Sequence, residues 1–455
     1  MGHLHGVGSP ARRELMLRAA ATSVALSALF IVVYGCTNWW TAQRPADEVR
    51  AWHFAWESTW IPYVPVLIVP YMSMDLFFFF ATFLCRDRRE LRTLALRVAF
   101  AIGVAALFFV LMPLKLAWPA RPAMDGWFGE FVEASCTAPF LMEYPHNLFP
   151  SLHIVLLLIV ADTWVKHTRG LVRMALVLWF ALIGLSTLLT WQHHVVDIAG
   201  GLIVAAFAFY FVRESSERSL VTPNARIGGY YAAGAMVVFL AAMCIDLWGV
   251  FLLWPSTALA MTAAAYLGWG PAVFRKRDWR LPWSARVALA PVLLGHWLSL
   301  LHYRRQCRAW DEVTPSVWIG RVLDDAEAED VVPRGVTAVL DLTAEFAEAS
   351  PFLDTTYRNV AVLDLTAPTS EQLREAVAFI AAEAERGTVY VHCKIGYSRS
   401  AAVVAAYLLA TGQASDVDDA IARLREARPA IVVRPEVIAA LHRFMEAECF
   451  LTATP

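Results

Sequence analysis

Eight apolar runs, each long enough to cross a lipid bilayer, limit what the first 272 residues of this chain can form. They lie at about residues 16–35, 61–84, 95–113, 152–166, 174–191, 196–213, 228–245 and 249–272. In lipid, the backbone polar groups of a spanning segment must be satisfied within the segment itself, which favours helices. Hydrophobic residues make up 58% of the 455 residues, more than is usual for a soluble protein. The sequence therefore predicts an all-α polytopic membrane helix bundle.

Basic residues gather on alternate loops between these runs, at Arg12–Arg18, Arg86–Arg97, Lys166–Arg173, Arg213–Arg226 and Arg275–Arg280. Because cytoplasmic loops carry the excess of Lys and Arg, we expect the N-terminus and these loops in the cytoplasm. The loops at 36–60, 114–151 and 192–195 then face outward. We expect a multi-pass protein of the bacterial inner membrane with a cytoplasmic C-terminal domain. The net charge of −2 gives no indication of a nucleic-acid partner.

From about residue 310, short strand-like segments alternate with helical ones. The expected strands are Val317–Gly320, Ala338–Leu342, Val360–Asp364 and Val389–His392, and the expected helices are 370–385, 400–411, 416–427 and 435–447. Such alternation predicts an α/β domain with a central, mostly parallel sheet.

Three domains follow from these patterns. Residues 1–225 form a six-helix membrane domain, residues 226–309 add two further transmembrane helices and a connecting helix, and residues 310–455 form the α/β domain. The run Val287–Tyr303 either crosses the membrane or lies on its cytoplasmic surface. We favour the surface helix, because a ninth crossing would export the C-terminal domain.

Residues 391–401, Val-His-Cys-Lys-Ile-Gly-Tyr-Ser-Arg-Ser-Ala, place a cysteine between a buried strand and a helix. At a helix N-terminus, backbone N–H groups and the helix dipole favour an anion and a thiolate. Cys393 is the expected nucleophile, which forms a phosphocysteine. Arg399, six residues later, offers a bidentate fork for phosphoryl oxygens.

The neighbours of Cys393 have expected roles in binding phosphate. The amides from Lys394 onward cradle phosphoryl oxygens, and Gly396 permits the tight backbone of the loop. Ser400 hydrogen-bonds the sulfur, and His392 orients the loop and lowers the thiol pKa. No metal or other cofactor is required.

The leaving alkoxide also needs a general acid. Asp364 is the favoured candidate because it ends an expected strand, and Asp341 and Asp354 are weaker ones.

The loop motif, the Asp364-x-Thr366 segment and Val432–Pro435 resemble those of dual-specificity phosphatases over residues 310–450. They are similar to the lipid-directed branch typified by mitochondrial phosphatidylglycerophosphate phosphatase. The resemblance implies metal-free hydrolysis of phosphomonoesters, and it leaves lipid, inositol, protein and RNA phosphates open as substrates.

Three outward-facing segments of the membrane part carry polar residues suited to a second phosphoryl site. They are Lys115 to Arg121, Ser151 to His153, and Ser186 to Asp197. His193 and Asp197 lie four residues apart, so the carboxylate can hold the imidazole in one tautomer.

This arrangement resembles the type 2 phosphatidic acid phosphatase superfamily. The resemblance implies that His193 is the nucleophile, that Asp197 activates it, and that His153 protonates the leaving oxygen. It also implies that Lys115, Arg121 and Ser151 bind phosphate.

The motifs depart from this family, because Thr187 stands where an arginine is usual and Leu152 where a glycine is usual. Similar departures occur in the branch that resembles inositol-phosphorylceramide synthases, so headgroup transfer to an alcohol is an alternative. A further alternative is a non-catalytic membrane part that anchors a protein phosphatase. The favoured reading is a bifunctional membrane phosphatase acting on lipid phosphates or other phosphomonoesters.

Overall fold

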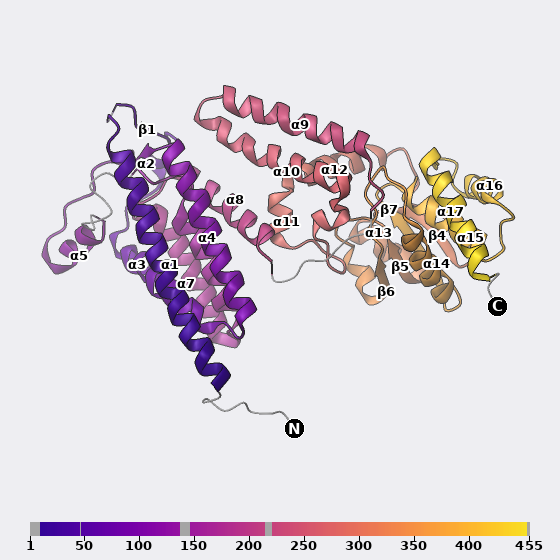
Figure 1. Ribbon diagram of the computed structural model, residues 1–455, viewed down its shortest axis with the longest axis horizontal. Coiled ribbons are helices and arrows are strands. Elements are labelled where there is room, and N and C mark those ends of the chain that lie inside the picture. Colours follow the sequence, from indigo (N-terminus) through magenta and orange to yellow (C-terminus); the bar gives the residue numbers. More distant parts are fainter. Residues whose placement is uncertain (1–9, 46, 137–145, 214–220, 453–455) are drawn as a thin grey trace. The chain divides into compact units, whose positions relative to one another are not determined.

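The computed structural model describes residues 10–45, 47–136, 146–213 and 221–452. The chain forms two compact units, Met1–Ser216 and Glu217–Pro455. The first unit is helical apart from one short pair of strands. The second joins a group of helices to an α/β domain, which agrees with the predicted fold class (Figure 1).

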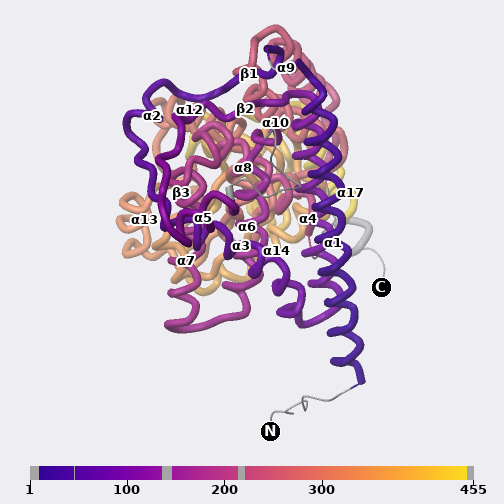
Figure 2. Tube along the Cα trace, turned by 90° about the vertical axis from the view of Figure 1, so that its left-hand side faces the viewer, coloured from indigo at the N-terminus to yellow at the C-terminus, as the bar shows by residue number. Residues whose placement is uncertain are grey.

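The first unit is a bundle in which α6 packs against α3, α4, α7 and α8 (Figure 2). Its helices are α1 (Pro10–Ala42), α2 (Glu57–Trp60), α3 (Ile68–Ala81), α4 (Arg88–Leu111), α5 (Gly126–Cys136), α6 (Leu152–Lys166), α7 (Gly170–Leu189) and α8 (Val195–Phe211). Small and branched side chains such as Ala105, Val155 and Ala205 are fully buried where these helices meet. The strands β1 (Arg50–Ala51) and β2 (Leu114–Lys115) pair in parallel.

Within the described part of the chain, six helical segments are long and apolar enough to cross a membrane. They are Pro10–Ala42, Pro65–Leu84, Arg88–Leu111, Gly170–Leu189, Ala225–Cys244 and Leu247–Trp269. The other two expected spans are the helices α6 and α8, which are shorter, at 15 and 17 residues. These six segments indicate a multi-pass membrane protein.

The second unit begins with a helical hairpin. The helices α9 (Ala225–Cys244) and α10 (Leu253–Ala264) pack together, and the Ser256 hydroxyl donates to the Ala235 carbonyl at 2.8 Å. The short helices α11 (Trp283–Ala288) and α12 (Ala290–Tyr303) follow. At 14 residues, α12 is about 21 Å long, too short to cross a bilayer of about 30 Å.

The α/β domain has a five-stranded sheet in the order β3-β4-β7-β5-β6. Its strands are β3 (Trp310–Thr314), β4 (Val317–Arg321), β5 (Val336–Asp341), β6 (Thr356–Asn359) and β7 (Thr388–Cys393). All pairings are parallel except that of β3 with β4, as the predicted mostly parallel sheet requires. Its helices are α13 (Asp325–Val331), α14 (Ser370–Ala384), α15 (Arg399–Ala410), α16 (Val417–Ala427) and α17 (Pro435–Thr452).

The prediction of a strand at Val360–Asp364 was wrong. Residues 360–364 follow β6 rather than form it, so Asp364 lies on a loop. The amides of Val360 and Val362 still donate to carbonyls of Asp341 and Leu342, at 2.9 and 3.1 Å. The apolar pattern reflects burial beside β5, and the chain leaves the sheet toward the cysteine loop.

Candidate active sites

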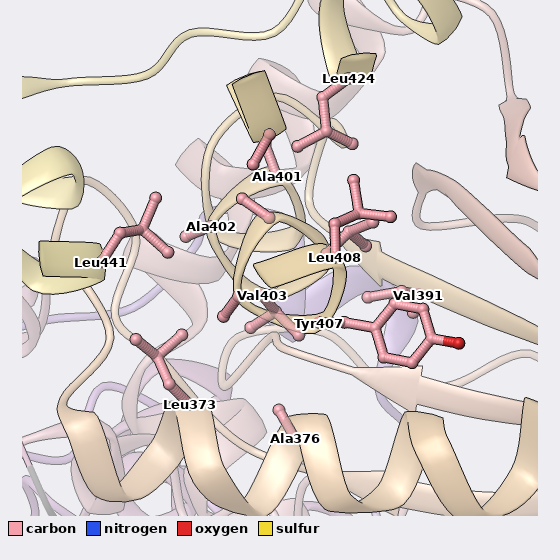
Figure 3. Close-up of a cluster of buried hydrophobic side chains, with 14 of the residues drawn as sticks. Leu373, Ala376, Val391, Ala401, Ala402, Val403, Tyr407, Leu408, Leu424 and Leu441 are labelled. Carbon is pink, nitrogen blue, oxygen red and sulfur yellow. The ribbon is translucent and has the colours of Figure 1, made fainter. Parts of the chain in front are cut away.

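Cys393 is the last residue of the central strand β7, and α15 begins at Arg399. Strands β4 and β5 flank β7, and the side chains of Val389 and Val391 are fully buried. Every residue of α15 from Arg399 to Leu409 is buried, and Figure 3 shows its Ala and Val side chains among those of α14, α16 and α17. A rigid strand and a rigid helix thus fix both ends of the loop at 394–398.

The Cys393 thiol receives hydrogen bonds suited to a thiolate. The Gly396 amide donates to Sγ at 3.3 Å, and the Ser400 hydroxyl lies 3.4 Å from it. Burial raises the pKa of Cys393, but the Arg399 charge and these hydrogen bonds outweigh burial and lower the pKa below that of an ordinary thiol. The predicted partner Ser400 therefore lies beside the sulfur, and the Gly396 amide is a second donor that had been expected only to permit the tight backbone.

We expect this lowered pKa to appear in the pH dependence of Cys393 alkylation by iodoacetamide. The thiolate is the reactive form, so reaction should persist below the pH at which an ordinary thiol is protonated. It should stop only as pH falls through the lowered pKa. Mass spectrometry of the modified peptide measures the rate, with free N-acetylcysteine in the same buffer as the reference thiol. Equal pH profiles for the two thiols would contradict the assignment.

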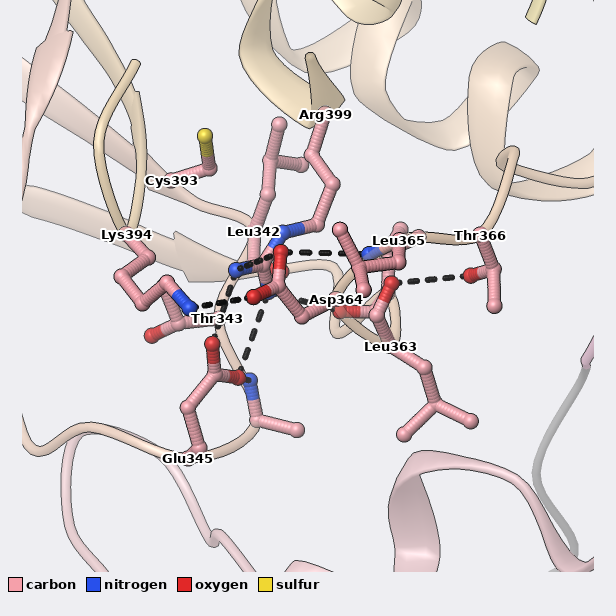
Figure 4. Close-up of polar contacts among 12 residues, drawn as sticks. Leu342, Thr343, Glu345, Leu363, Asp364, Leu365, Thr366, Cys393, Lys394 and Arg399 are labelled. Atoms are coloured by element: carbon pink, nitrogen blue, oxygen red, sulfur yellow. Dashed lines mark hydrogen bonds and ion pairs between the residues drawn. The ribbon is translucent and has the colours of Figure 1, made fainter. Parts of the chain in front are cut away.

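Arg399 is 1% exposed, and its guanidinium contacts two carboxylates (Figure 4). Glu345 accepts from Nη1 and Nη2 at 3.2 and 2.7 Å, and Asp364 accepts from Nη2 at 3.2 Å. The fork expected to hold phosphate therefore faces Glu345, which the sequence analysis did not identify. The Nε–H is buried and has no hydrogen-bond partner among the residues that the structure describes, so it is a donor available to a phosphoryl oxygen.

Asp364 lies between the cations of the site. Its Oδ1 accepts from Arg399 and its Oδ2 from Lys394 (Figure 4). Burial raises the pKa of Asp364, but the charges of Arg399 and Lys394 outweigh burial and hold the pKa below the ordinary carboxyl value. Asp364 is thus ionised in the free protein, and it can act as an acid only after a substrate phosphate takes up these cations.

A buried polar network lies behind the loop. His392 Nε2 is 2.8 Å from Glu348 Oε2 and 3.8 Å from Asp341 Oδ1. Asp341 also accepts from Tyr357 at 2.7 Å and from Lys276. Burial lowers the pKa of His392, but the charges of Glu348 and Asp341 outweigh burial and raise it. His392 thus reaches acids that fix its ring beside the loop.

Arg428 holds the outer side of the loop, a role not foreseen from the sequence. It is 1% exposed, and it donates to the carbonyls of Gly396 and Ile395 at 3.0 Å each. Gly396 has φ +78°, and a Cβ there would approach the Gly320 carbonyl oxygen to 2.5 Å. The turn therefore requires glycine, as predicted.

In the membrane part, the structure brings the two predicted catalytic histidines to one cavity. His153 and His193 line a space of about 180 Å³, together with Asp75. The His193 Nδ1 lies 3.5 Å from Asp197 Oδ2, and the ring of His153 stacks on Tyr71 with centroids 4.3 Å apart. The position of Asp75 in the sequence gave no indication that it would line this cavity.

The residues predicted to bind phosphate at this site, Lys115, Arg121 and Ser151, are not in the lining of the cavity that His153 and His193 share. Ser151 is buried, caps α6, and donates its amide to the Asp197 carbonyl at 3.0 Å, which ties α6 to α8. Arg121 donates to the Trp191 carbonyl at 3.2 Å. Among the described residues, neither Arg121 nor Lys115 belongs to the lining of the histidine cavity.

His194, rather than His193, makes the short contact with a carboxylate. Its Nδ1 lies 2.6 Å from Glu57 Oε2, and its Nε2 accepts from the Ala117 amide at 3.1 Å. Its backbone N–H donates to Asp197 at 2.9 Å. Trp118 stacks on the ring at 4.8 Å. The sequence showed the two adjacent histidines but not Glu57, which lies 137 residues away.

A comparison with protein families matches the C-terminal part of the chain. The dual specificity phosphatase catalytic domain matches residues 325–447, which include Cys393, Arg399 and Asp364. Residues 325–447 form a dual-specificity phosphatase domain. No match to the phosphatidic acid phosphatase superfamily is found.

Individual relatives of the phosphatase domain agree with this match. Human protein phosphatase Slingshot homolog 3 is 34% identical over 125 residues, which are 27% of this chain and 18% of that protein. The Arabidopsis thaliana phosphatidylglycerophosphate phosphatase PTPMT1 is 31% identical over 111 residues, 22% of this chain and 32% of that protein. The chain thus spans a third or less of these relatives.

Among solved structures, PTPMT1 in complex with PI(5)P aligns with a TM-score of 0.30 and 25% identity. The alignment covers 32% of this chain and 100% of the PTPMT1 chain.

Side chains from before residue 325 contact the phosphatase domain close to its candidate catalytic residues. Lys276 bonds Asp341, the Tyr266 hydroxyl donates to the Asp364 carbonyl, and Asn224 donates to the Leu365 carbonyl. His296 of α12 lies beside Glu345 and Asp364, with ligand atoms within 4.8 Å of one another. The domain is therefore packed against α9–α12 at its active site.

Two groups of acids and histidines have spacings that could hold a cation. They are His296, Glu345 and Asp364, and Asp341, Glu348 and His392. The carboxylates of the first group already pair with Arg399 and Lys394, and Asp341 of the second pairs with Lys276. These fixed positive charges oppose a metal ion at either place.

Proposed function

We propose that this protein is a membrane phosphatase that hydrolyses phosphomonoesters through a phosphocysteine at Cys393. The observation that carries this proposal is the buried thiol of lowered pKa, bonded by Gly396 and Ser400 at the start of α15. Arg399 and Lys394 supply positive charge beside it. A thiolate with adjacent cations is the arrangement that nucleophilic attack on a phosphate dianion needs.

In this mechanism the Cys393 sulfur attacks phosphorus as the bond to the leaving oxygen breaks. The phosphoryl oxygens of the substrate accept a hydrogen bond from the Arg399 Nε–H. They also compete with the Asp364 carboxylate for the other donors of Arg399 and for Lys394. As Arg399 and Lys394 turn to the phosphate, the pKa of Asp364 rises and its carboxylate takes a proton from solvent, which it then donates to the leaving alkoxide. Water then cleaves the S–P bond, with Asp364 accepting its proton and Ser400 bonding the departing sulfur.

We propose a lipid phosphate as the substrate. The Cys393 pocket, of about 260 Å³, has Tyr303, Leu365 and Val432 in its lining, and these side chains are 42%, 40% and 48% exposed. Such an apolar margin suits the backbone of a lipid better than a charged peptide. The similarity to a phosphatidylglycerophosphate phosphatase supports the same class. We place the domain on the cytoplasmic side of a bacterial inner membrane, with no nucleic-acid partner.

A second activity is proposed at the outer face, through a phosphohistidine at His193. It is supported by the cavity that His153, His193 and Asp75 share, and by Asp197 near the His193 ring. His153 would protonate the leaving oxygen and Ser151 would help bind phosphate, with Lys115 and Arg121 reaching the phosphate from outside the cavity. Ionisable side chains within a membrane bundle are costly, so a cluster of them is by default a candidate functional site.

We expect His193→Ala to abolish phosphate release from one lipid and to leave another, hydrolysed at Cys393, unaffected. The loss should be about 10⁴-fold, because the nucleophile is removed. Purified full-length protein would be assayed with phosphatidic acid, phosphatidylglycerophosphate and an isoprenyl phosphate. His167→Ala is the matched control. His167 directly follows α6 and pairs with Glu90, whereas His153 lies at the start of that helix.

Other outcomes would select the alternatives. Unchanged hydrolysis of every lipid by His193→Ala would make the membrane part an anchor. A new lipid, formed when an alcohol acceptor is added and lost in His193→Ala, would make the site a headgroup transferase.

A further inference from the structure

We propose that the α9–α10 hairpin positions the general acid of the phosphatase domain, through Tyr266 and Asn224. Both residues precede the matched domain, and they hold the two adjacent peptide carbonyls of Asp364 and Leu365. This inference rests on the proposed function of Cys393, and it adds two positioning residues to that site.

Tyr266 makes the first contact. Its hydroxyl donates to the Asp364 carbonyl at 2.8 Å, and the side chain is 2% exposed. Asn224 makes the second contact, because its Nδ2 donates to the Leu365 carbonyl at 3.2 Å. Arg434 of the phosphatase domain donates to the same carbonyl at 3.5 Å. Among the described residues, the hairpin therefore supplies two of the three side-chain donors to the carbonyls of Asp364 and Leu365.

The backbone at this turn is strained, so it needs external support. Leu365 has φ +61°, a left-handed conformation that is costly for a residue with a branched side chain. Its amide donates to Asp364 Oδ1 at 3.1 Å. The direction of the Asp364 carboxylate thus depends on a peptide geometry that hydrogen bonds from outside maintain. A strained residue persists where the surrounding structure over-determines it.

Asn224 and Tyr266 lie at the same end of the hairpin and are held together. The Asn224 side-chain oxygen caps α9 by accepting from the Ile227 backbone amide at 3.2 Å. The backbone amide of Asn224 donates to the Tyr266 carbonyl at 2.9 Å. Tyr231 of α9 stacks on Tyr266 with centroids 5.5 Å apart. The neighbouring ends of two candidate membrane spans are thus bonded to each other, and both donate hydrogen bonds to the acid loop.

A positioning role for the acid can be separated from a general structural role by the leaving group. An alkyl phosphate expels a strongly basic alkoxide that needs a proton, whereas 4-nitrophenyl phosphate expels a stable anion that needs little help. Loss of acid positioning should therefore lower kcat/KM, which reports the step in which the leaving group departs, for the alkyl substrate only. A distorted cysteine loop would lower kcat/KM for both.

The test compares Tyr266→Phe and Asn224→Asp in the full-length protein. Each removes one donor to the acid loop, and aspartate keeps an oxygen that can cap α9. We expect kcat/KM for glycerol 3-phosphate, relative to that for 4-nitrophenyl phosphate, to fall roughly 3- to 10-fold in each variant. Asp364→Asn should show the same selectivity with a larger loss, roughly 10²-fold or more. Tyr231→Phe is the matched control and should leave the ratio unchanged.

Each other result has a defined meaning. If Asp364→Asn is selective but Tyr266→Phe and Asn224→Asp leave the ratio unchanged, or lower both rates equally, the hairpin does not position the acid. If Tyr266→Phe fails to fold, Asn224→Asp decides by the same ratio. If neither substrate is hydrolysed in a Cys393-dependent way, the proposed function fails, and this inference fails with it.

Discussion

Replacing Cys393 with serine should remove phosphomonoesterase activity at the C-terminal site by about 10⁴-fold or more. A serine hydroxyl is almost fully protonated at neutral pH, and the described contacts of Cys393 Sγ, the Gly396 amide and the Ser400 hydroxyl, offer no base to take its proton. The contacts that lower the Cys393 pKa, from Arg399, Ser400 and the Gly396 amide, stabilise an anion but do not accept a proton. Phosphate release from 4-nitrophenyl phosphate by purified full-length protein measures the effect.

The control is Cys244→Ser, because Cys244 is a free, exposed cysteine of the same unit. It should retain full activity. Stable binding of inorganic phosphate by Cys393→Ser would show that the loop is intact. Activity in Cys393→Ser equal to that of the wild type would remove the C-terminal assignment and leave the phosphatase domain as a binding module.

The cysteine loop could be predicted because its contacts are local. The thiol meets the Gly396 amide three residues away and the Ser400 hydroxyl seven residues away. A strand that ends and a helix that starts bring these groups together whatever the rest of the chain does. The same reasoning applies to the spans and to the strands β4, β5 and β7, whose apolar patterns depend on burial alone.

The partners of this loop could not be predicted because they come from distant segments. Arg399 meets Glu345 across 54 residues, Arg428 meets Asp311 across 117, and Tyr266 meets Asp364 across 98. No periodicity relates such positions, and each could equally be a surface residue. The strand expected at 360–364 failed for a related reason, because burial beside β5 gives a loop the composition of a strand.

The membrane site shows the same division between local and distant contacts. The four-residue spacing of His193 and Asp197 predicted their proximity, and the structure has them 3.5 Å apart, with His193 just before the start of α8 at Val195. The Glu57 partner of His194 and the place of Asp75 in the cavity depend on how the helices pack. The catalytic roles at this site stay predictions.

Lys276→Met should destabilise the second unit by about 3–5 kcal/mol, because it leaves a buried carboxylate without its cation. Lys276 and Asp341 have side chains that are 2% and 0% exposed. Burial raises the pKa of Asp341, but the Lys276 charge outweighs burial and lowers the pKa to about 2. Thermal unfolding of the detergent-solubilised full-length chain should show a melting temperature lower by roughly 10 °C.

The pH dependence distinguishes a lost ion pair from lost packing. In the wild type, the depressed pKa of Asp341 contributes stability above its unfolded value, which is lost only as pH falls through about 2. In Lys276→Met the unpaired carboxyl takes up a proton at higher pH, so the difference between the two proteins should shrink as the medium is acidified. Lys276→Met with Asp341→Asn should recover part of the loss, whereas Lys166→Met, at a pair whose lysine is 47% exposed, should cost about 1 kcal/mol or less. A difference that stays constant with pH would mean that Lys276 acts through its apolar stem and not through the Asp341 charge.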